Sequence, residues 1–154
     1  MGRILGIDYG TRRVGVAISD PTAMLSTPLS VEHVRSMEEA VAVVVRIARE
    51  RAVEKIVVGM PINMDGTKGA IALETEKYVE LLKTASGLPV DITDERLSTS
   101  LVERMLLSAD VSRGRRKEVR DKLAAQVILQ GYLDAHDGGA EYRGDTDDDP
   151  YGTD

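Results

Sequence analysis

The sequence predicts a single α/β domain in which a mixed sheet is flanked by helices. Apolar runs at residues 3–9 and 14–19 flank a short turn at residues 10–13, which is typical of an antiparallel hairpin. After the hairpin, strand-like runs alternate with helical periodicity, which indicates parallel strands joined by helices. The length of 154 residues suits one domain, and the 42% hydrophobic content is sufficient for a core.

The first half of the chain continues from the hairpin to a third strand, a helix and a fourth strand. The third strand is expected near residues 29–31, after a loop that ends at Pro28. Ser36 and Glu39 form a capping-box pattern, which predicts the start of a helix. The run at residues 55–60 predicts a buried strand. The apolar face of the helix would consist of Met37, Ala40, Val41, Val44 and Ala48.

The second half predicts a helix, a strand and a long closing helix. A helix is expected over about residues 70–84, and a strand over residues 90–94. Residues 112–117 form a basic, glycine-containing stretch that favours a loop, and the closing helix is expected over about residues 117–136. The side chains expected to point inward from the first of these helices are Ile71, Tyr78, Leu81 and Leu82.

Two domain-level predictions follow from composition. Residues 1–136 form the folded domain, whereas residues 137–154, rich in Gly, Asp, Thr and Pro, are predicted to be an acidic disordered tail. A further helix is expected after Ser100, which forms a second capping-box pattern with Glu103.

The net charge of −6 belongs to the tail. Residues 134–154 hold eight of the 26 acids and one of the 20 basic residues, so residues 1–133 carry a net charge of +1.

Composition excludes several classes of function. The absence of cysteine excludes disulfides, thiolate zinc sites and cysteine nucleophiles, and two histidines, His33 and His136, leave little room for histidine-based catalysis. With no Trp or Phe, a module that reads bases by aromatic stacking is disfavoured. The longest apolar run, residues 40–45, is too short to span a bilayer, and Asp8 interrupts the N-terminal apolar stretch too early for a signal peptide. These features predict a cytoplasmic protein with no membrane partner.

Three acids stand where patterning alone would not place them. Asp8 lies inside an apolar strand, Glu95 follows a strand, and Asp121 lies early in the closing helix, where small residues would allow close packing. A carboxylate directed into a core is costly unless it is paired or bound to a cation. Taken singly, each acid also has an ordinary role as a turn former, an ion-pair partner or a helix-start acid. Together they indicate a hard divalent metal, Mg²⁺ or Mn²⁺.

Four sequence blocks carry a family resemblance. They are IDYGTRRVGVA (7–17), VGMPINMDG (58–66), DERLST (94–99) and DKLAAQVIL (121–129), and in this order and spacing they resemble the YqgF/RuvX family over about residues 3–134. The departures are Ser98, where Thr is commoner, and Lys122, where a small residue is usual. Neither departure removes an acid, although Lys122 could alter the charge near a metal.

The resemblance implies a fold, an activity and a site. It implies an RNase H-like nuclease with a fold similar to that of RuvC Holliday-junction resolvases. The implied activity is maturation of the 5′ end of pre-16S ribosomal RNA. It also implies that Asp8, Glu95 and Asp121 are the catalytic, metal-binding acids. In a two-metal arrangement, one ion activates a water and the other stabilises the leaving oxygen, with Asp8 bridging the two ions.

Basic residues adjoin each proposed catalytic acid in the sequence. A basic rim around an acidic centre would position phosphates without reading the nucleotide sequence. Steep weakening of binding with salt would accompany it. The residues expected to bind nucleic acid are Arg12, Arg13, Arg96, Arg113, Arg115, Arg116 and Lys117.

Several alternatives remain open from the sequence. A resolvase acting on branched DNA would share the fold and would be expected to form a dimer, whereas the oligomeric state here is either a monomer or a homodimer. A non-catalytic RNA- or ribosome-associated factor would retain the acids only for structure. An actin-like ATPase or sugar kinase shares the first block but closes two such domains around its nucleotide. Precursor rRNA is the favoured partner, and ribosomal particles are a further candidate.

Overall fold

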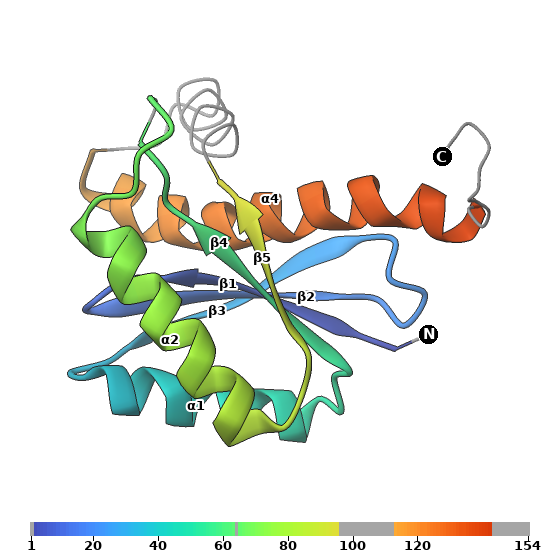
Figure 1. Cartoon of the computed structure of the whole chain (residues 1–154), viewed down its shortest axis with the longest axis horizontal. Coiled ribbons are helices and arrows are strands. Elements are labelled where there is room, and N and C mark those ends of the chain that lie inside the picture. The colour runs from blue at the N-terminus through green and yellow to red at the C-terminus, as the bar shows by residue number, and fades with distance from the viewer. Residues whose placement is uncertain (1, 64, 96–112, 143–154) are drawn as a thin grey trace.

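The computed structural model describes residues 2–63, 65–95 and 113–142, and in the last stretch it describes the side chains of residues 120 and 123–136. One sheet has the strand order β3-β2-β1-β4-β5 (Figure 1). β1, β2 and β3 pair antiparallel, and β4 and β5 extend the sheet parallel to β1, so the predicted mixed sheet is confirmed. The strands are β1 (Ile4–Tyr9), β2 (Arg13–Ser19), β3 (Ser26–His33), β4 (Lys55–Met60) and β5 (Val90–Asp94).

Helices cover both faces of the sheet. α1 (Met37–Glu50) and α2 (Ala70–Ser86) lie on one face, and α4 (Arg113–Tyr142) lies across the other (Figure 1). The larger core cluster joins α1 and α2 to the sheet, and a smaller one joins α4 to it. Among the described residues, none of the helices has the length and apolar character needed to cross a bilayer.

The start of α1 confirms the capping prediction. The Ser36 hydroxyl accepts a hydrogen bond from the Glu39 amide at 3.1 Å, and the Glu39 carboxylate accepts one from the Arg35 amide at 2.6 Å. Both bonds satisfy backbone donors at the beginning of the helix. The predicted apolar face is buried or partly buried against the core, and it comprises Met37, Ala40, Val41, Val44 and Ala48.

The inward face of α2 differs from the prediction. Tyr78 and Leu82 are buried as expected, but Ile71 and Leu81 are 39% and 41% exposed. The buried stripe instead includes Thr75, whose hydroxyl donates to the Ile71 carbonyl at 2.7 Å and so needs no other partner. Because a polar residue occupies the centre of the stripe, apolar periodicity placed the face wrongly.

α4 is longer than the sequence indicated at both ends. It begins at Arg113, so the basic stretch expected to be a loop is helical from that residue onward. Arg and Lys favour helices, and a glycine costs only about 1 kcal/mol in an established helix. The helix also continues past His136 to Tyr142, into the predicted tail. The rest of that tail, residues 143–154, and the helix expected after Ser100 lie outside the described residues.

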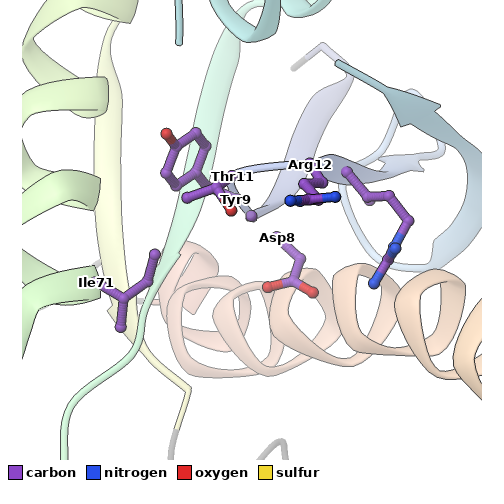
Figure 2. Close-up of a pocket in the computed structure, with 8 residues that line it drawn as sticks. Asp8, Tyr9, Thr11, Arg12 and Ile71 are labelled. Atoms are coloured by element: carbon purple, nitrogen blue, oxygen red, sulfur yellow. The ribbon is translucent and has the colours of Figure 1, made fainter. Parts of the chain in front are cut away.

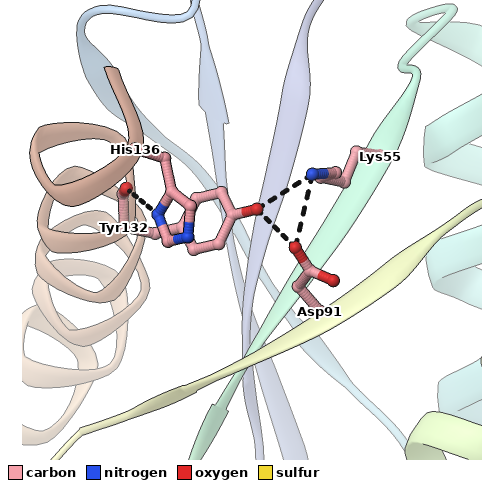
Figure 3. A network of polar contacts seen from close by, with 4 residues as sticks. All are labelled: Lys55, Asp91, Tyr132 and His136. Atoms are coloured by element: carbon pink, nitrogen blue, oxygen red, sulfur yellow. Dashed lines mark hydrogen bonds and ion pairs between the residues drawn. The ribbon is translucent and has the colours of Figure 1, made fainter. Parts of the chain in front are cut away.

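A polar network attaches the middle of α4 to the sheet (Figure 3). The Lys55 ammonium donates to the Tyr132 hydroxyl at 2.9 Å and pairs with Asp91 at 3.3 Å, and the Tyr132 hydroxyl donates to Asp91. The hydrogen bond from Tyr132, together with Lys55, lowers the pKa of Asp91. His136 stacks on the Tyr132 ring with centroids 3.9 Å apart. Both His136 and His33 are exposed, as predicted.

Two glycines allow α4 to approach the sheet closely. A Cβ atom on Gly6 would lie 2.5 Å from the Leu129 Cβ and 3.2 Å from the Ala125 carbonyl oxygen. A Cβ atom on Gly59 would lie 2.6 Å from the Ile128 Cδ1. Ala125 itself is fully buried, as expected for a small residue at a close helix–sheet contact. These contacts fix the position of α4 over β1 and β4.

Candidate functional site

Two of the three proposed acids meet at one edge of the sheet. Asp8 lies near the end of β1, and Glu95 comes directly after β5. Because β1, β4 and β5 run parallel, their carboxyl ends share this edge. Side chains alternate along a strand, so Asp8 faces the same side as Gly6, toward α4. Figure 2 shows its carboxylate directed at that helix.

The space for Glu95 comes from a missing side chain on β4. The Glu95 amide donates to the Met60 carbonyl at 3.3 Å, which continues the β4–β5 pairing. One carboxylate oxygen of Glu95 lies 3.0 Å from the point that a Cβ atom on Gly59 would occupy. Glu95 therefore folds over Gly59 beside Ile128, on the same face as Asp8.

The carboxyl groups of Asp8 and Glu95 share a hydrogen bond. Two carboxylates can form such a bond only if one of them carries a proton. Burial raises the pKa of Glu95, the charge of Asp94 raises it further, and the hydrogen bond to Asp8 partly opposes the shift. The site thus holds two acids whose joint ionisation is unfavourable without a positive charge nearby.

The donor set suits a hard divalent cation. Two carboxyl groups in contact provide oxygen ligands of the kind that Mg²⁺ and Mn²⁺ prefer, and a bound cation would remove the need for the shared proton. Within the described side chains, no group of three metal-ligating residues occurs. The side chain of Asp121, the third proposed ligand, lies outside them, although its backbone belongs to α4.

The structure places two of the seven proposed basic residues around the same hollow as Asp8. Arg12, in the β1–β2 turn, and Arg13, the first residue of β2, line the same hollow as Asp8, and Figure 2 shows Arg12 there. Arg96 lies outside the described residues, as do the side chains on the first turns of α4. A role in binding nucleic acid stays a prediction for all seven residues. The structure does not describe the side chains of five of them, Arg96, Arg113, Arg115, Arg116 and Lys117.

The hollow also contains residues that the sequence did not single out. It has a volume of about 350 Å³ and is lined by Asp8, Tyr9, Gly10, Thr11, Arg12, Arg13, Gly15 and Ile71. Outside the hollow, the sequence analysis also missed Gly59, which makes room for Glu95. An isolated glycine in a strand pattern often marks a close backbone approach, so the sequence did contain a signal for Gly59. No comparable signal pointed to Ile71, since its periodicity predicted burial.

Comparisons of structure identify the fold. Thermus thermophilus RuvC in complex with a Holliday-junction substrate aligns with a TM-score of 0.59 at 16% identity, over 90% of this chain and 97% of that one. The resolvase of fowlpox virus aligns with a TM-score of 0.54 at 12% identity, over 86% of this chain and 97% of that one. The fold is therefore that of the RuvC-like, RNase H-like nucleases.

Comparisons of sequence define the family. The model of the RuvX family, described as Holliday junction resolvase, matches residues 2–135. A protein of Symbiobacterium thermophilum is 53% identical over 86% of this chain and 92% of its own length, and one of Syntrophomonas wolfei is 45% identical over 91% and 99%. Both carry the name "Putative pre-16S rRNA nuclease". The chain belongs to the RuvX family.

Proposed function

We propose that this protein is a divalent-metal-dependent nuclease that processes the 5′ end of precursor 16S rRNA. The contact between the carboxyl groups of Asp8 and Glu95, at the sheet edge of an RNase H-like fold, carries the proposal. The names of the relatives at 45% and 53% identity support the choice of substrate.

Each acid has a defined task in this proposal. Asp8, Glu95 and Asp121 would hold Mg²⁺ or Mn²⁺, and Asp121 is included because the sequence places it on the helix that covers the Asp8 face. When bound, the cation would supply an activated water and charge stabilisation for the leaving oxygen. Glu95 is only partly exposed, so bulk water screens the charges at this point less than at an open surface.

The basic residues have the complementary task of holding phosphates. Arg12 and Arg13 line the same hollow as Asp8, where they would attract the backbone on either side of the scissile bond. Arg96 and the basic residues at the start of α4 would extend this surface. A phosphate surface of this kind predicts strongly salt-dependent binding and no sequence preference of its own.

A Holliday-junction resolvase is the second candidate function. The description of the family model and the junction-bound RuvC structure favour it. Such an enzyme must present two sites to a symmetric junction, so it requires a homodimer, whereas processing of an RNA end can be performed by a monomer. A non-catalytic factor bound to rRNA or ribosomal particles is the alternative of a different class. All these roles are cytoplasmic.

A substrate panel separates the candidates. The wild-type protein is incubated with Mg²⁺ or Mn²⁺ and with precursor 16S rRNA, an unrelated single-stranded RNA or a four-way DNA junction. Cleavage of the precursor near the mature 5′ end supports the proposal, and symmetrical cutting of the junction supports the resolvase. Stoichiometric binding of rRNA with no cleavage under either metal supports the non-catalytic role and contradicts both nucleases.

A further inference from the structure

The hollow beside Asp8 has two chemically different sides. Figure 2 shows Ile71 and Arg12 on opposite sides in that view, with the Asp8 carboxylate below Arg12. Arg12 is exposed, and Ile71 is 39% exposed at the start of α2. Thr11 is exposed and offers a hydroxyl that can both donate and accept. A ligand matched to this hollow would combine an anionic group, a polar part and a flat apolar part.

Tyr9, one of the residues that line the hollow, is firmly held in place. The Tyr9 ring is 7% exposed and stacks on the Tyr78 ring, with centroids 4.3 Å apart and an angle of 24° between the rings. Tyr78 is fully buried, and its hydroxyl donates to the Ala40 carbonyl at 2.9 Å. The two rings thus connect the lining of the hollow to α2, and the Tyr78 hydroxyl connects α2 to α1. A ligand here would meet a preformed surface and would not have to order it.

The size and position of the hollow limit what can occupy it. Its volume of about 350 Å³ is at the small end of ligand pockets, which run from roughly 300 to 1,000 Å³. Asp8 is one of its lining residues, so an occupant is adjacent to any phosphate held at the acids. A base that remains paired and stacked in a duplex cannot enter a pocket of this kind, and only an unpaired base can be placed in it.

We propose that the hollow binds the nucleotide next to the scissile phosphate, with its base unpaired and in contact with Ile71 and its phosphate near Arg12. This inference rests on the proposed nuclease function and adds a rule of specificity to it. The enzyme cuts where the nucleotide next to the bond is single-stranded, and paired nucleotides at that position slow the reaction. Direct readout of the base identity is not required, since Ile71 offers only an apolar surface.

The test compares Ile71→Ala with Leu73→Ala as a matched control. Both residues are exposed aliphatic side chains on α2, but Leu73, at 58% exposure, does not line the hollow. The substrates are an oligonucleotide with the mapped scissile bond unpaired, the same strand paired to its complement, and the same strand with an abasic nucleotide beside the bond. Ile71→Ala removes the apolar contact and should lower kcat/KM on the unpaired substrate about tenfold, mainly by raising KM. Leu73→Ala should leave kcat/KM on this substrate unchanged.

Two further outcomes complete the test. The abasic substrate should already be cut about tenfold more slowly by the wild type, and Ile71→Ala should cause no additional loss on it. Equal cleavage of the paired and unpaired substrates, or an equal loss in both variants, would overturn the inference while the nuclease function stands.

A binding measurement separates this inference from the function on which it rests. The affinity of the short single-stranded oligonucleotide and its abasic form is measured for Asp8→Asn protein, alone and combined with Ile71→Ala. A preference for the intact base that disappears with Ile71→Ala supports the hollow even if no substrate is cut. Absence of cleavage by the wild type on every substrate would instead refute the proposed function.

Discussion

Replacement of Gly59 by alanine separates the packing of α4 from the geometry of the acids. The added Cβ would lie 2.6 Å from the Ile128 Cδ1 and 3.0 Å from a Glu95 carboxylate oxygen. The first contact involves the end of a side chain, so Ile128 can give way, at an overpacking cost of about 1–3 kcal/mol. The second contact displaces Glu95. Misplacement of a catalytic group by a fraction of an ångström to 1 Å costs about tenfold to a hundredfold in rate.

Gly6→Ala is the comparison variant, because its added methyl group meets α4 at Leu129 and Ala125. A Cβ atom on Gly6 would meet the Leu129 Cβ at 2.5 Å and the Ala125 carbonyl oxygen at 3.2 Å, and neither atom can move without the helix. The loss of stability should therefore reach or exceed about 3 kcal/mol, more than for Gly59→Ala. Gly131→Ala is the clash-free control, because its Cβ meets nothing within 4 Å, and a gain in stability of about 0.5–1 kcal/mol is expected.

The assay combines urea denaturation with kcat/KM measured at a temperature where every variant is folded. Gly59→Ala should lose activity out of proportion to its stability, and Gly6→Ala should lose stability first. A Gly59→Ala protein with wild-type cleavage would refute the placement of Glu95 over Gly59. Equal stability of the Gly6 and Gly59 variants would contradict the distinction between rigid and flexible neighbours.

Two further predictions concern polar groups that the structure places in contact. Tyr132→Phe removes a hydroxyl that bonds both Lys55 and Asp91, so the free energy of unfolding should fall by about 1–2 kcal/mol, given that both partners keep access to solvent. The pKa of Asp91, followed by NMR, should rise toward its ordinary value in this variant, and an unchanged titration would show that the hydroxyl is not its main partner. Glu95→Gln should stabilise the metal-free protein at neutral pH, because the raised pKa of Glu95 means that its ionised form is disfavoured in the folded state. Wild-type stability should accordingly fall as the pH rises from 4.5, the ordinary pKa of this group, through its folded-state pKa. The stability advantage of the variant should disappear below that pH range. A variant less stable than wild type at neutral pH without metal would contradict this.

The elements that sequence patterning predicted well are those in which local and tertiary preferences agree. The apolar runs of β1, β2 and β4 are buried along nearly their whole length, so their composition alone identified them. The Ser36–Glu39 pattern is a local backbone interaction and was found where expected. Asp8 and Glu95 were predicted to meet through the family resemblance alone, and the parallel strands β1, β4 and β5 give the structural reason.

The elements predicted less well depend on contacts that only the fold creates. β3 extends from Ser26 to His33 and includes Pro28, which a strand tolerates here because β3 is an edge strand. The pairing of β2 with β3 shifts its register next to Pro28: Val16 pairs with Ser30, and Ala17 pairs with Pro28. The buried face of α2 includes Thr75, which can be buried because its hydroxyl bonds within its own helix, and no pattern of apolar residues reveals this.

Cleavage of precursor 16S rRNA by Asp8→Asn protein tests the central claim most directly. The substitution keeps the size of the side chain and removes the charge that the proposed cation site requires. With Mg²⁺ or Mn²⁺, wild-type protein should cut the precursor, and the folded variant should lose nearly all activity while its affinity for the RNA is retained. Full metal-dependent cleavage by Asp8→Asn would contradict the assignment of the acids.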